Sequence, residues 1–366
     1  MGTSNPVNNW IFFVYTMRIA LLYTNPYHQE INDLILDVFS NFKFKNIQLY
    51  EIKYQNFKWY DLLKLIKFRR FLKKNQIDII HAYHYSDAHY AMMASKGLNV
   101  KVVYSCYFYH DKLKGFRKKT FENVLNKVDS IIFQTDVQKN KFVSKYNINS
   151  QKCHKLCHAF YFERFDDFKF SSLRDEFFID DFKYIIGTLG DFTSEHDMMN
   201  VMRMVKKLRK TGRNFTCLLA GEQIDEYDHC FNDCKYYYLV QGLDNYVNFV
   251  GHRYDVANYL SQLDAFVYHS DNEPLALPVI MALVSGANVV VNDNEMIREI
   301  TGNGKYATLF KPNDAADFAD KTRHILMDLE DYQLIAETVQ EECREIFGIE
   351  RHVIGLREIY LNVKQC

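Results

Sequence analysis

Short apolar segments alternate with longer amphipathic segments along most of this 366-residue chain, and the alternation limits its fold more than any other feature. Ten segments have the length and apolar composition of strands: 18–23, 47–52, 77–83, 100–105, 130–135, 184–190, 215–221, 247–251, 265–270 and 287–293. Helical patterns lie between and after them: 28–41, 58–75, 86–96, 136–146, 195–211, 254–262, 277–285, 314–328, 331–346 and 349–363. Strands separated by helices are typical of a parallel sheet covered on both faces. The sequence therefore predicts an α/β fold.

The alternation is interrupted at 166–182, a locally acidic stretch that we interpret as a linker. It divides the chain into a predicted N-terminal domain, 17–165, and a C-terminal domain, 183–346, followed by a final helical segment, 347–366. Because 48% of the residues are hydrophobic, each part is able to bury its own core. We expect two doubly wound, Rossmann-like domains that face a central cleft, with ligands at the carboxyl ends of the strands.

The formal charge of −1 conceals two halves of opposite sign. Residues 1–165 contain 25 Lys and Arg against 12 Asp and Glu, a net charge of +13. The chain totals of 45 basic and 46 acidic residues leave 20 and 34 for residues 166–366, a net charge of −14. This asymmetry predicts that the two domains have different partners.

The eight cysteines are scattered through a long chain, which predicts reduced thiols and a cytoplasmic location. Two short motifs, "CHKLCH" (153–158) and "HCFNDC" (229–234), raise the question of a metal site. Zinc requires four ligands in a fixed geometry, and these motifs lie in different predicted domains. A structural loop at 153–158 is the favoured interpretation, and no metal is predicted.

The second half of the chain resembles the retaining glycosyltransferases of the GT-B fold, family four. The similar segments include "YIIGTLG" (184–190), "FTCLLAGE" (215–222) and "FVYHSDNEPLALPVIMALVSGANVVVND" (266–293). The block 251–293 is the most specific part of the match. The first half is similar more loosely, through "DIIHAY" (78–83) and "VVYS" (102–105), so that the resemblance covers nearly the whole chain from Met17.

The resemblance implies a transferase that moves a hexose from a UDP- or GDP-linked sugar to a lipid-linked or cell-surface glycan, with retention, as in polysaccharide biosynthesis. It implies that the C-terminal domain holds the nucleotide-sugar and that the last helix packs back on the N-terminal domain. The leaving phosphate itself helps to deprotonate the acceptor in this family. No cofactor besides the donor substrate is expected.

Glu273 matches the first glutamate of the family's paired motif, which contacts the donor sugar; the alternative is a carboxylate that only stabilises a helix N-terminus. Leu277 and Pro278 begin the following helix, whose N–H groups are expected to face a phosphate. His269 ends the preceding strand, with either a ligand-facing or a structural role. His110 is expected to contact the sugar or the acceptor, because the family has a histidine three residues earlier.

Three positions depart from the family pattern. Met281 replaces the second glutamate, and Asp191 and Glu195 stand where the family has an arginine and a lysine beside the diphosphate. Arg253 and Lys311 are the predicted replacement cations. These departures leave a second hypothesis open, a non-catalytic GT-B scaffold or substrate-binding subunit that assists another transferase.

The predicted helix at 58–74 carries seven basic residues and one acidic residue among its apolar ones. It is either a solvated helix that packs by its apolar stripe or a contact for an anionic membrane surface, and a second basic stretch lies at 112–119. No nucleic-acid-binding module is recognised, so nucleic acid is not a predicted partner. The chain is predicted to be cytoplasmic, or peripheral at the inner face of the cell membrane.

Overall fold

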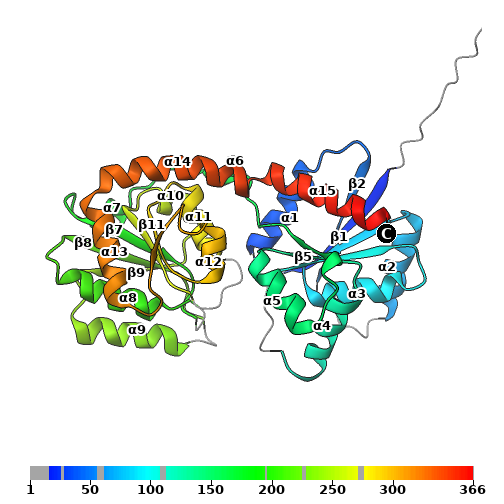
Figure 1. Cartoon of the computed structure of the whole chain (residues 1–366), viewed down its shortest axis with the longest axis horizontal. Helices are drawn as coiled ribbons and strands as arrows, with labels where there is room; N and C mark the ends of the chain where they lie inside the picture. Colours follow the sequence, from blue (N-terminus) through cyan, green and yellow to red (C-terminus); the bar gives the residue numbers. More distant parts are fainter. Residues whose placement is uncertain are drawn as a thin grey trace, which may run out of the picture. The chain divides into compact units, whose positions relative to one another are not determined.

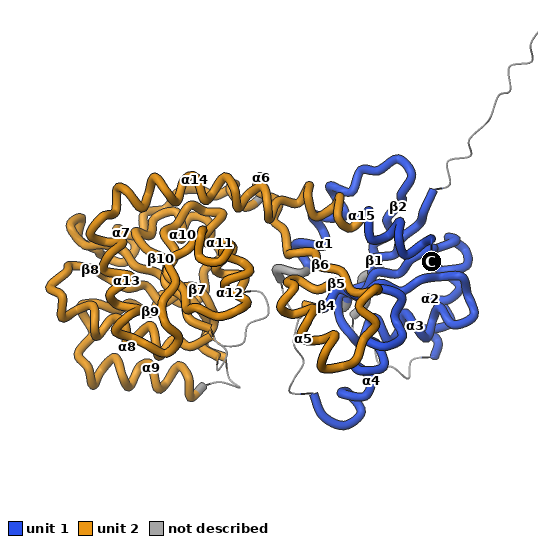
Figure 2. Tube along the Cα trace, viewed as in Figure 1, with its two compact units in different colours: residues 1–106, 112–131, 357–366 blue, residues 107–111, 132–356 orange. Residues whose placement is uncertain are grey.

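The computed structural model describes residues 16–25, 29–55, 62–107, 113–193, 196–224, 228–270 and 276–365. Its strands form two six-stranded parallel sheets (Figure 1). The chain divides into two compact units (Figure 2). Unit 1 comprises Met1–Cys106, Lys112–Ile131 and Arg357–Cys366, and unit 2 comprises Tyr107–Asp111 and Ile132–Leu356.

The first sheet has the strand order β2-β1-β3-β4-β5-β6. Its strands are β1 (Met17–Asn25), β2 (Ile47–Gln55), β3 (Ile79–Ala82), β4 (Lys101–Cys106), β5 (Ser130–Phe133) and β6 (Cys153–Lys155). The helices of this part are α1 (Gln29–Asn41), α2 (Leu62–Lys74), α3 (Tyr85–Ser95), α4 (Gly115–Lys127) and α5 (Asp136–Tyr146). Strand β1 is buried on both faces, since consecutive residues from Ile19 to Leu22 are all inaccessible to solvent.

The second sheet has the strand order β12-β11-β10-β7-β8-β9. Its strands are β7 (Tyr184–Leu189), β8 (Phe215–Ala220), β9 (Val247–Gly251), β10 (Ala265–Tyr268), β11 (Val289–Asn292) and β12 (Thr308–Phe310). The remaining helices are α6 (Phe162–Asp166), α7 (Leu173–Glu176), α8 (Met198–Arg209), α9 (Asp228–Gln241), α10 (Val256–Leu260), α11 (Leu277–Val284), α12 (Glu295–Ile300), α13 (Ala315–Met327), α14 (Leu329–Phe347) and α15 (Ile349–Gln365).

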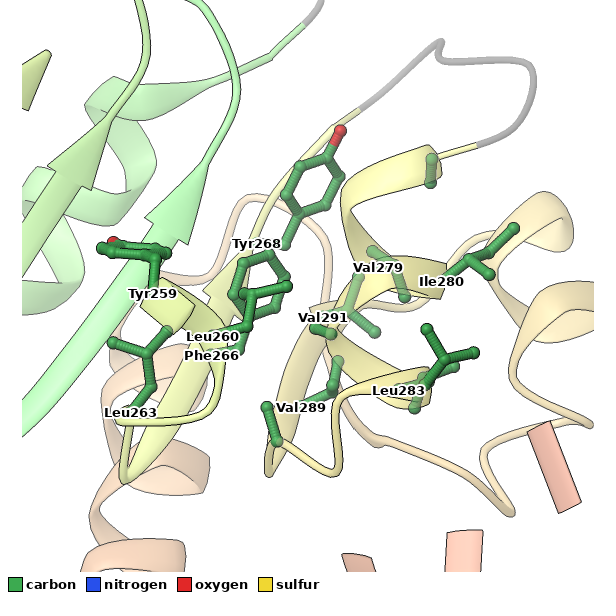
Figure 3. Packing of buried hydrophobic residues seen from close by; sticks show 14 of the residues in the cluster. Tyr259, Leu260, Leu263, Phe266, Tyr268, Val279, Ile280, Leu283, Val289 and Val291 are labelled. Carbon is green, nitrogen blue, oxygen red and sulfur yellow. The ribbon is translucent and has the colours of Figure 1, made fainter. Parts of the chain in front are cut away.

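Alternate residues of the second sheet belong to two separate hydrophobic clusters, because successive side chains of a strand point to opposite faces. Phe266 and Tyr268 of β10 pack in one cluster with α10 and α11, as Figure 3 shows. Ala265 and Val267 pack in the other cluster, with α8 and α13. Both faces of the sheet are therefore covered, as the near-continuous apolar strands predicted.

The final helix contributes to unit 1 through its second half. Tyr360 is fully buried, and its hydroxyl lies 2.7 Å from His81 Nδ1 of β3. Its ring also packs near Phe42, while Lys364 pairs with Asp78. No helix in the described ranges is long and apolar enough to cross a bilayer.

The predicted α/β class, with two parallel sheets that are each covered by helices, is confirmed. Two long helices were not predicted. Helix α4 lies in the stretch interpreted only as a basic segment, because three buried side chains, Phe121, Val124 and Leu125, leave a weak apolar period. Helix α9 contains the motif 229–234, for which the sequence only raised the question of a metal site; its Cys230 and Cys234 are one helical turn apart.

The predicted linker 166–182 contains helix α7 and is part of unit 2. Leu173 is fully buried, and its backbone N–H donates to Gln262 Oε1 at 2.9 Å. Ser171 N–H donates to Asn258 Oδ1 at 3.2 Å. The acidic, interrupted pattern in the sequence thus conceals two buried apolar side chains, Leu173 and Ile179. The domain boundaries themselves remain a prediction.

Candidate active site

The carboxyl edge of the second sheet has a topological switch point between β7 and β10. The chain adds β8 and β9 on one side of β7 and adds β11 and β12 on the far side of β10. Loops that leave two neighbouring strands in opposite directions open a crevice, which is where open α/β sheets bind ligands. The described residues at this point are 190–193 and 196–197, after β7, and 269–270 and 276, after β10.

The segment after β10 is held at its first residues by an asparagine from the neighbouring strand. Ser270 N–H donates to Asn292 Oδ1 at 3.1 Å, and Asn292 Nδ2 donates to Ser270 O at 3.0 Å. Asn294 Nδ2, from the N-cap of α12, donates to the same carbonyl at 3.1 Å. Ser270 and Asn292 are buried, so these bonds are shielded from water. The backbone at Ser270 therefore has a fixed position, three residues before Glu273.

His269 is fully buried and faces a carboxylate from the segment after β7. Its Nδ1 lies 3.2 Å from Asp197 Oδ2, and its carbonyl accepts a hydrogen bond from Asp197 N–H at 3.1 Å. Asp197 is also the N-cap of α8, since Oδ1 accepts from Asn200 N–H at 3.1 Å. Burial acts to raise the pKa of Asp197, but the hydrogen bond and charge of His269 lower it below its ordinary value. The two segments are thus joined at the switch point.

His196 lies beside this pair and is also buried. Its ring stacks on Tyr268 at 4.6 Å between centroids, and its backbone forms a bridge with Ser270. Burial lowers the pKa of His196 to about 4. The ring is therefore neutral at pH 7 and serves as packing beneath the site.

Asp191 has a structural contact that the sequence did not predict. Its Oδ1 accepts a hydrogen bond from Glu222 N–H at 2.8 Å, which ties the segment after β7 to the end of β8. The backbones approach closely here, because a Cβ on Gly221 would overlap the carbonyl of Gly190. The carboxylate of Asp191 therefore has a structural role that does not depend on any ligand.

The two predicted replacement cations, Arg253 and Lys311, follow the two edge strands of the sheet, β9 and β12. With strands about 4.8 Å apart, the ends of these two strands are separated by roughly 24 Å. The Arg253 guanidinium binds Glu176 and Asp255, with N–O distances of 2.6 Å and 2.7 Å. Burial acts to lower the pKa of Arg253, and these carboxylates raise it above its ordinary value. Lys311 is exposed, and its backbone N–H donates to Asp317 Oδ2 at 2.7 Å.

Helix α11 begins with Leu277 and Pro278, as predicted. The residue before it, Ala276, has a left-handed backbone (φ 44°, ψ 53°) and is buried, so the chain turns sharply into the helix. Met281, where the family has its second glutamate, is half-buried and packs against the hydrophobic cluster beneath the helix. The methionine therefore has a packing role.

The predicted catalytic residues Glu273 and His110 lie outside the described residues, as does Glu195. Within the ranges that the structure describes, no three His, Cys, Asp or Glu side chains are close enough to hold a metal ion. In the motif 153–158, Cys157 Sγ contacts Gln134 O at 3.1 Å. Cys153 begins strand β6, and burial lowers the pKa of His158 to about 3. These contacts are those of a packed loop.

Three residues of the switch point were not singled out from the sequence: Asp197, Asn292 and Asn294. Two of them carry a recognisable signal, since Asp197 and Asn294 each stand directly before an apolar helical run as N-caps. Asn292 carries none, because an asparagine at the end of a buried strand is interpreted equally well as the start of a turn.

Comparisons with known proteins agree with the fold. The family described as Glycosyl transferases group 1 matches residues 169–342, and Glycosyltransferase Family 4 matches residues 38–159. No curated protein sequence matches the chain. A glycosyltransferase from Rickettsia africae has a similar fold, with 16% identity and a TM-score of 0.79 over 95% of this chain and 98% of its own.

Two further solved structures are similar. HepE from Anabaena, in complex with UDP and glucose, has 15% identity and a TM-score of 0.78, with 94% of this chain and all of that chain covered. Sucrose-phosphate synthase from Thermosynechococcus elongatus has 13% identity and a TM-score of 0.75, with 95% and 99% covered. At these identities the likeness is one of fold.

Proposed function

Because this chain belongs to the group 1 glycosyltransferases with the GT-B fold, we propose that it moves a hexose from a nucleotide-sugar to a lipid-linked or cell-surface glycan, with retention. The donor is UDP- or GDP-linked, and the Anabaena neighbour that was solved with UDP-glucose favours UDP. The reaction takes place in the cytoplasm or at the inner face of the cell membrane, as one step of polysaccharide biosynthesis.

The observation that carries the proposal is the set of hydrogen bonds that hold the backbone of Ser270. Asn292 and Asn294 fix the backbone three residues before Glu273, and the left-handed Ala276 fixes it three residues after. A catalytic carboxylate must be held within a fraction of an ångström of its productive position, and two rigid flanks are suited to this. In the proposed site Glu273 accepts hydrogen bonds from the donor sugar, and His110 contacts the sugar or the acceptor.

The leaving diphosphate develops negative charge, and fixed donors there lower the barrier. Leu277 offers a backbone N–H at the start of α11, whereas Pro278 has none and sets the direction of the helix. Of the two predicted cations, Lys311 is the more available to a phosphate, because Arg253 is already neutralised by two carboxylates. His269 supports the site from beneath through Asp197.

The test compares Glu273→Gln with Glu295→Gln, a matched control at an exposed glutamate of α12. Both substitutions remove one negative charge, but only the first removes the proposed sugar contact. We expect Glu273→Gln to lower kcat by roughly 30- to 1,000-fold, corresponding to about 2–4 kcal/mol of transition-state stabilisation. Release of UDP or GDP from the nucleotide-sugar is the readout. Equal turnover in wild type and Glu273→Gln means that the site assignment is wrong.

The second hypothesis, a non-catalytic GT-B scaffold or substrate-binding subunit, is favoured by two contacts. The guanidinium of Arg253 is paired with Glu176 and Asp255, and Met281 packs against the hydrophobic cluster, so both side chains have structural roles. Thermal-shift measurements with UDP-, GDP- and ADP-sugars separate a scaffold from a protein that binds the donor, because a ligand that binds only the folded state raises Tm. The absence of any shift at millimolar nucleotide-sugar favours the scaffold.

A further inference from the structure

Helix α2 presents large apolar side chains to solvent. Leu62, Leu63 and Ile66 are 65%, 72% and 37% exposed, and Lys67 and Arg70 share their face of the helix. The opposite face carries two buried side chains, Phe68 and Leu72, and the Phe68 ring stacks on Tyr90 of α3. The three exposed apolar residues are therefore not needed for the core.

Helix α4 has the same combination at its first turn. Phe116 is 66% exposed, and the neighbouring basic residues are exposed as well: Lys114, Arg117, Lys118 and Lys119. The core contacts of α4 come later, from Phe121 onward. Between these four cations and the acidic residues in the described part of the chain there is one ion pair, Lys118 with Glu122 at 3.9 Å. This end of the helix is thus an exposed aromatic ring within a group of positive charges.

The two groups lie at the same edge of the first sheet. Each helix follows a parallel strand and returns toward the start of the next, so α2 and α4 both begin at the carboxyl edge. Helix α3 packs against both of them (Figure 1). With helix axes 8–10 Å apart, the beginnings of α2 and α4 are roughly 20 Å from each other. We call this surface the basic rim, defined by Leu62, Leu63, Ile66, Lys67 and Arg70 of α2 and by Lys114, Phe116, Arg117, Lys118 and Lys119 of α4.

We propose that the basic rim docks unit 1 on an anionic membrane surface, with the apolar side chains in the headgroup region and the lysines and arginines on the lipid phosphates. Cations attract the anionic leaflet, and exposed apolar side chains gain by leaving water at the interface. A nucleic acid would use the charges but would leave Leu62, Leu63 and Phe116 in water. The net charge of +13 over residues 1–165 strengthens the attraction. This docking does not depend on glycosyl transfer.

Arg69 is not part of the basic rim, although it lies in the same basic sequence. Its Nη1 donates to the carbonyl oxygens of Ala94 and Lys96, at 2.8 Å and 2.7 Å. These bonds satisfy carbonyls at the end of α3 and hold α2 against it. Substitution of Arg69 would disturb the fold, so the test leaves it unchanged.

The first experiment measures sedimentation of the full-length chain with vesicles of phosphatidylglycerol and phosphatidylcholine, and with phosphatidylcholine alone. A rim variant carries Lys67, Arg70, Arg117 and Lys119→Gln. A control variant carries Lys43, Lys45, Lys96 and Lys127→Gln, which are also exposed but lie at the amino edge of the same sheet. Both lose four positive charges. We expect the rim variant to bind anionic vesicles at least roughly a hundredfold more weakly, and the control to bind within about threefold of wild type.

The second experiment tests the apolar part with the double substitution Leu63→Ser and Phe116→Ser. We expect about tenfold weaker binding to anionic vesicles, with a loss that persists at high salt, because burial of apolar surface is not screened. If the rim and control variants lost equal amounts of vesicle binding, net charge alone would explain the loss, and the proposal would be overturned. Wild-type binding by the Leu63→Ser, Phe116→Ser chain would also overturn it. A wild-type chain that binds RNA or heparin but no vesicle has a polyanion site instead.

Discussion

The carboxyl edges of the two parallel sheets carry different kinds of side chains. At the second sheet, polar side chains are turned inward and bonded to the backbone of neighbouring segments: Asn292 and Asn294 on Ser270, and Asp191 on Glu222. At the first sheet, helices α2 and α4 begin with exposed apolar and basic side chains. An edge bonded in this way suits a small polar ligand that must be held precisely in place. An edge with exposed charged and apolar side chains suits contact with a broad surface.

Each unit has a buried histidine at its sheet, and the two histidines have different partners. His81 of β3 lies between two neutral hydroxyl groups, Tyr360 at 2.7 Å and Ser105 at 2.8 Å. His269, directly after β10, faces the carboxylate of Asp197 at 3.2 Å. The first arrangement satisfies both ring nitrogens of a packed side chain, whereas the second brings a charge to the edge of the sheet. The same residue type thus marks packing in one unit and electrostatics in the other.

The largest expected effect comes from the close backbone contact in unit 2. Gly221→Ala places a Cβ on the carbonyl of Gly190 and should destabilise unit 2 by at least about 4 kcal/mol, because neither backbone is free to move. Gly97→Ala in unit 1 is the matched control, with φ of 72° and nothing within 4 Å of the new Cβ. It should cost about 1–2 kcal/mol, from the left-handed backbone alone. Urea unfolding followed by circular dichroism measures both, and similar costs would contradict the close contact.

Acid should destabilise unit 2 through its buried histidines. Burial lowers the pKa values of His158, His196 and His352 to about 3, 4 and 4. The unfolded chain binds these protons near pH 6.5, and the folded chain does so only near pH 4. The stability is therefore complete above pH 6.5 and declines as the pH falls toward 4, by about 3 kcal/mol for each histidine.

His158→Phe should reduce this loss, because His158 already packs against aromatic rings, with Phe160 at 5.1 Å and Tyr107 at 6.0 Å. The measurement is Tm between pH 7.5 and 4.5 for wild type, His158→Phe and the exposed control His324→Phe. We expect the first variant to have the flattest profile and the control to follow wild type. Three parallel profiles would show that His158 does not resist protonation.

The smallest expected effects come from replacing the partners of His269 and His81. Asp197→Asn keeps a helix N-cap but removes the charge that faces His269, and should cost about 1–2 kcal/mol at neutral pH. Because the folded pKa of Asp197 is lowered, this difference should disappear as the pH falls through that pKa. Tyr360→Phe removes a neutral partner of His81 and should cost about 1 kcal/mol at every pH. Unfolding measured at a series of pH values from 7 downward tests both, and a pH-independent cost for Asp197→Asn would remove the distinction.

Much of the fold could be predicted from local patterns. The strand at 247–251 and the helix at 136–146 were predicted with the bounds that the structure has. Residues 77–83 were predicted as a strand that the structure limits to Ile79–Ala82. Helix α4 was missed because only three of its side chains are buried, so the apolar period was too weak to recognise. Periodicity reports burial, and helices with little burial give little signal.

The candidate site was less accessible to such reasoning. His269 was recognised from its place after a strand, but its partner Asp197 lies 72 positions earlier. Arg253 was predicted as a phosphate cation, and the structure pairs it with Glu176, 77 residues away. The sequence shows that a charge is present near a strand end. It does not show which distant carboxylate occupies it.

The sequence by itself determined the α/β class, the order of most strands and helices and the opposite charges of the two halves. These follow from apolar periodicity and residue counts, which are local properties of the chain. Only the tertiary structure decided what each polar side chain is bonded to: Asn292 to Ser270, Asp191 to Glu222, Arg69 to Ala94. It also decided that Leu62 and Phe116 remain in solvent while Phe68 is buried. The physical reason is that hydrogen bonds and burial depend on neighbours in space, and the folding of distant segments against one another selects those neighbours.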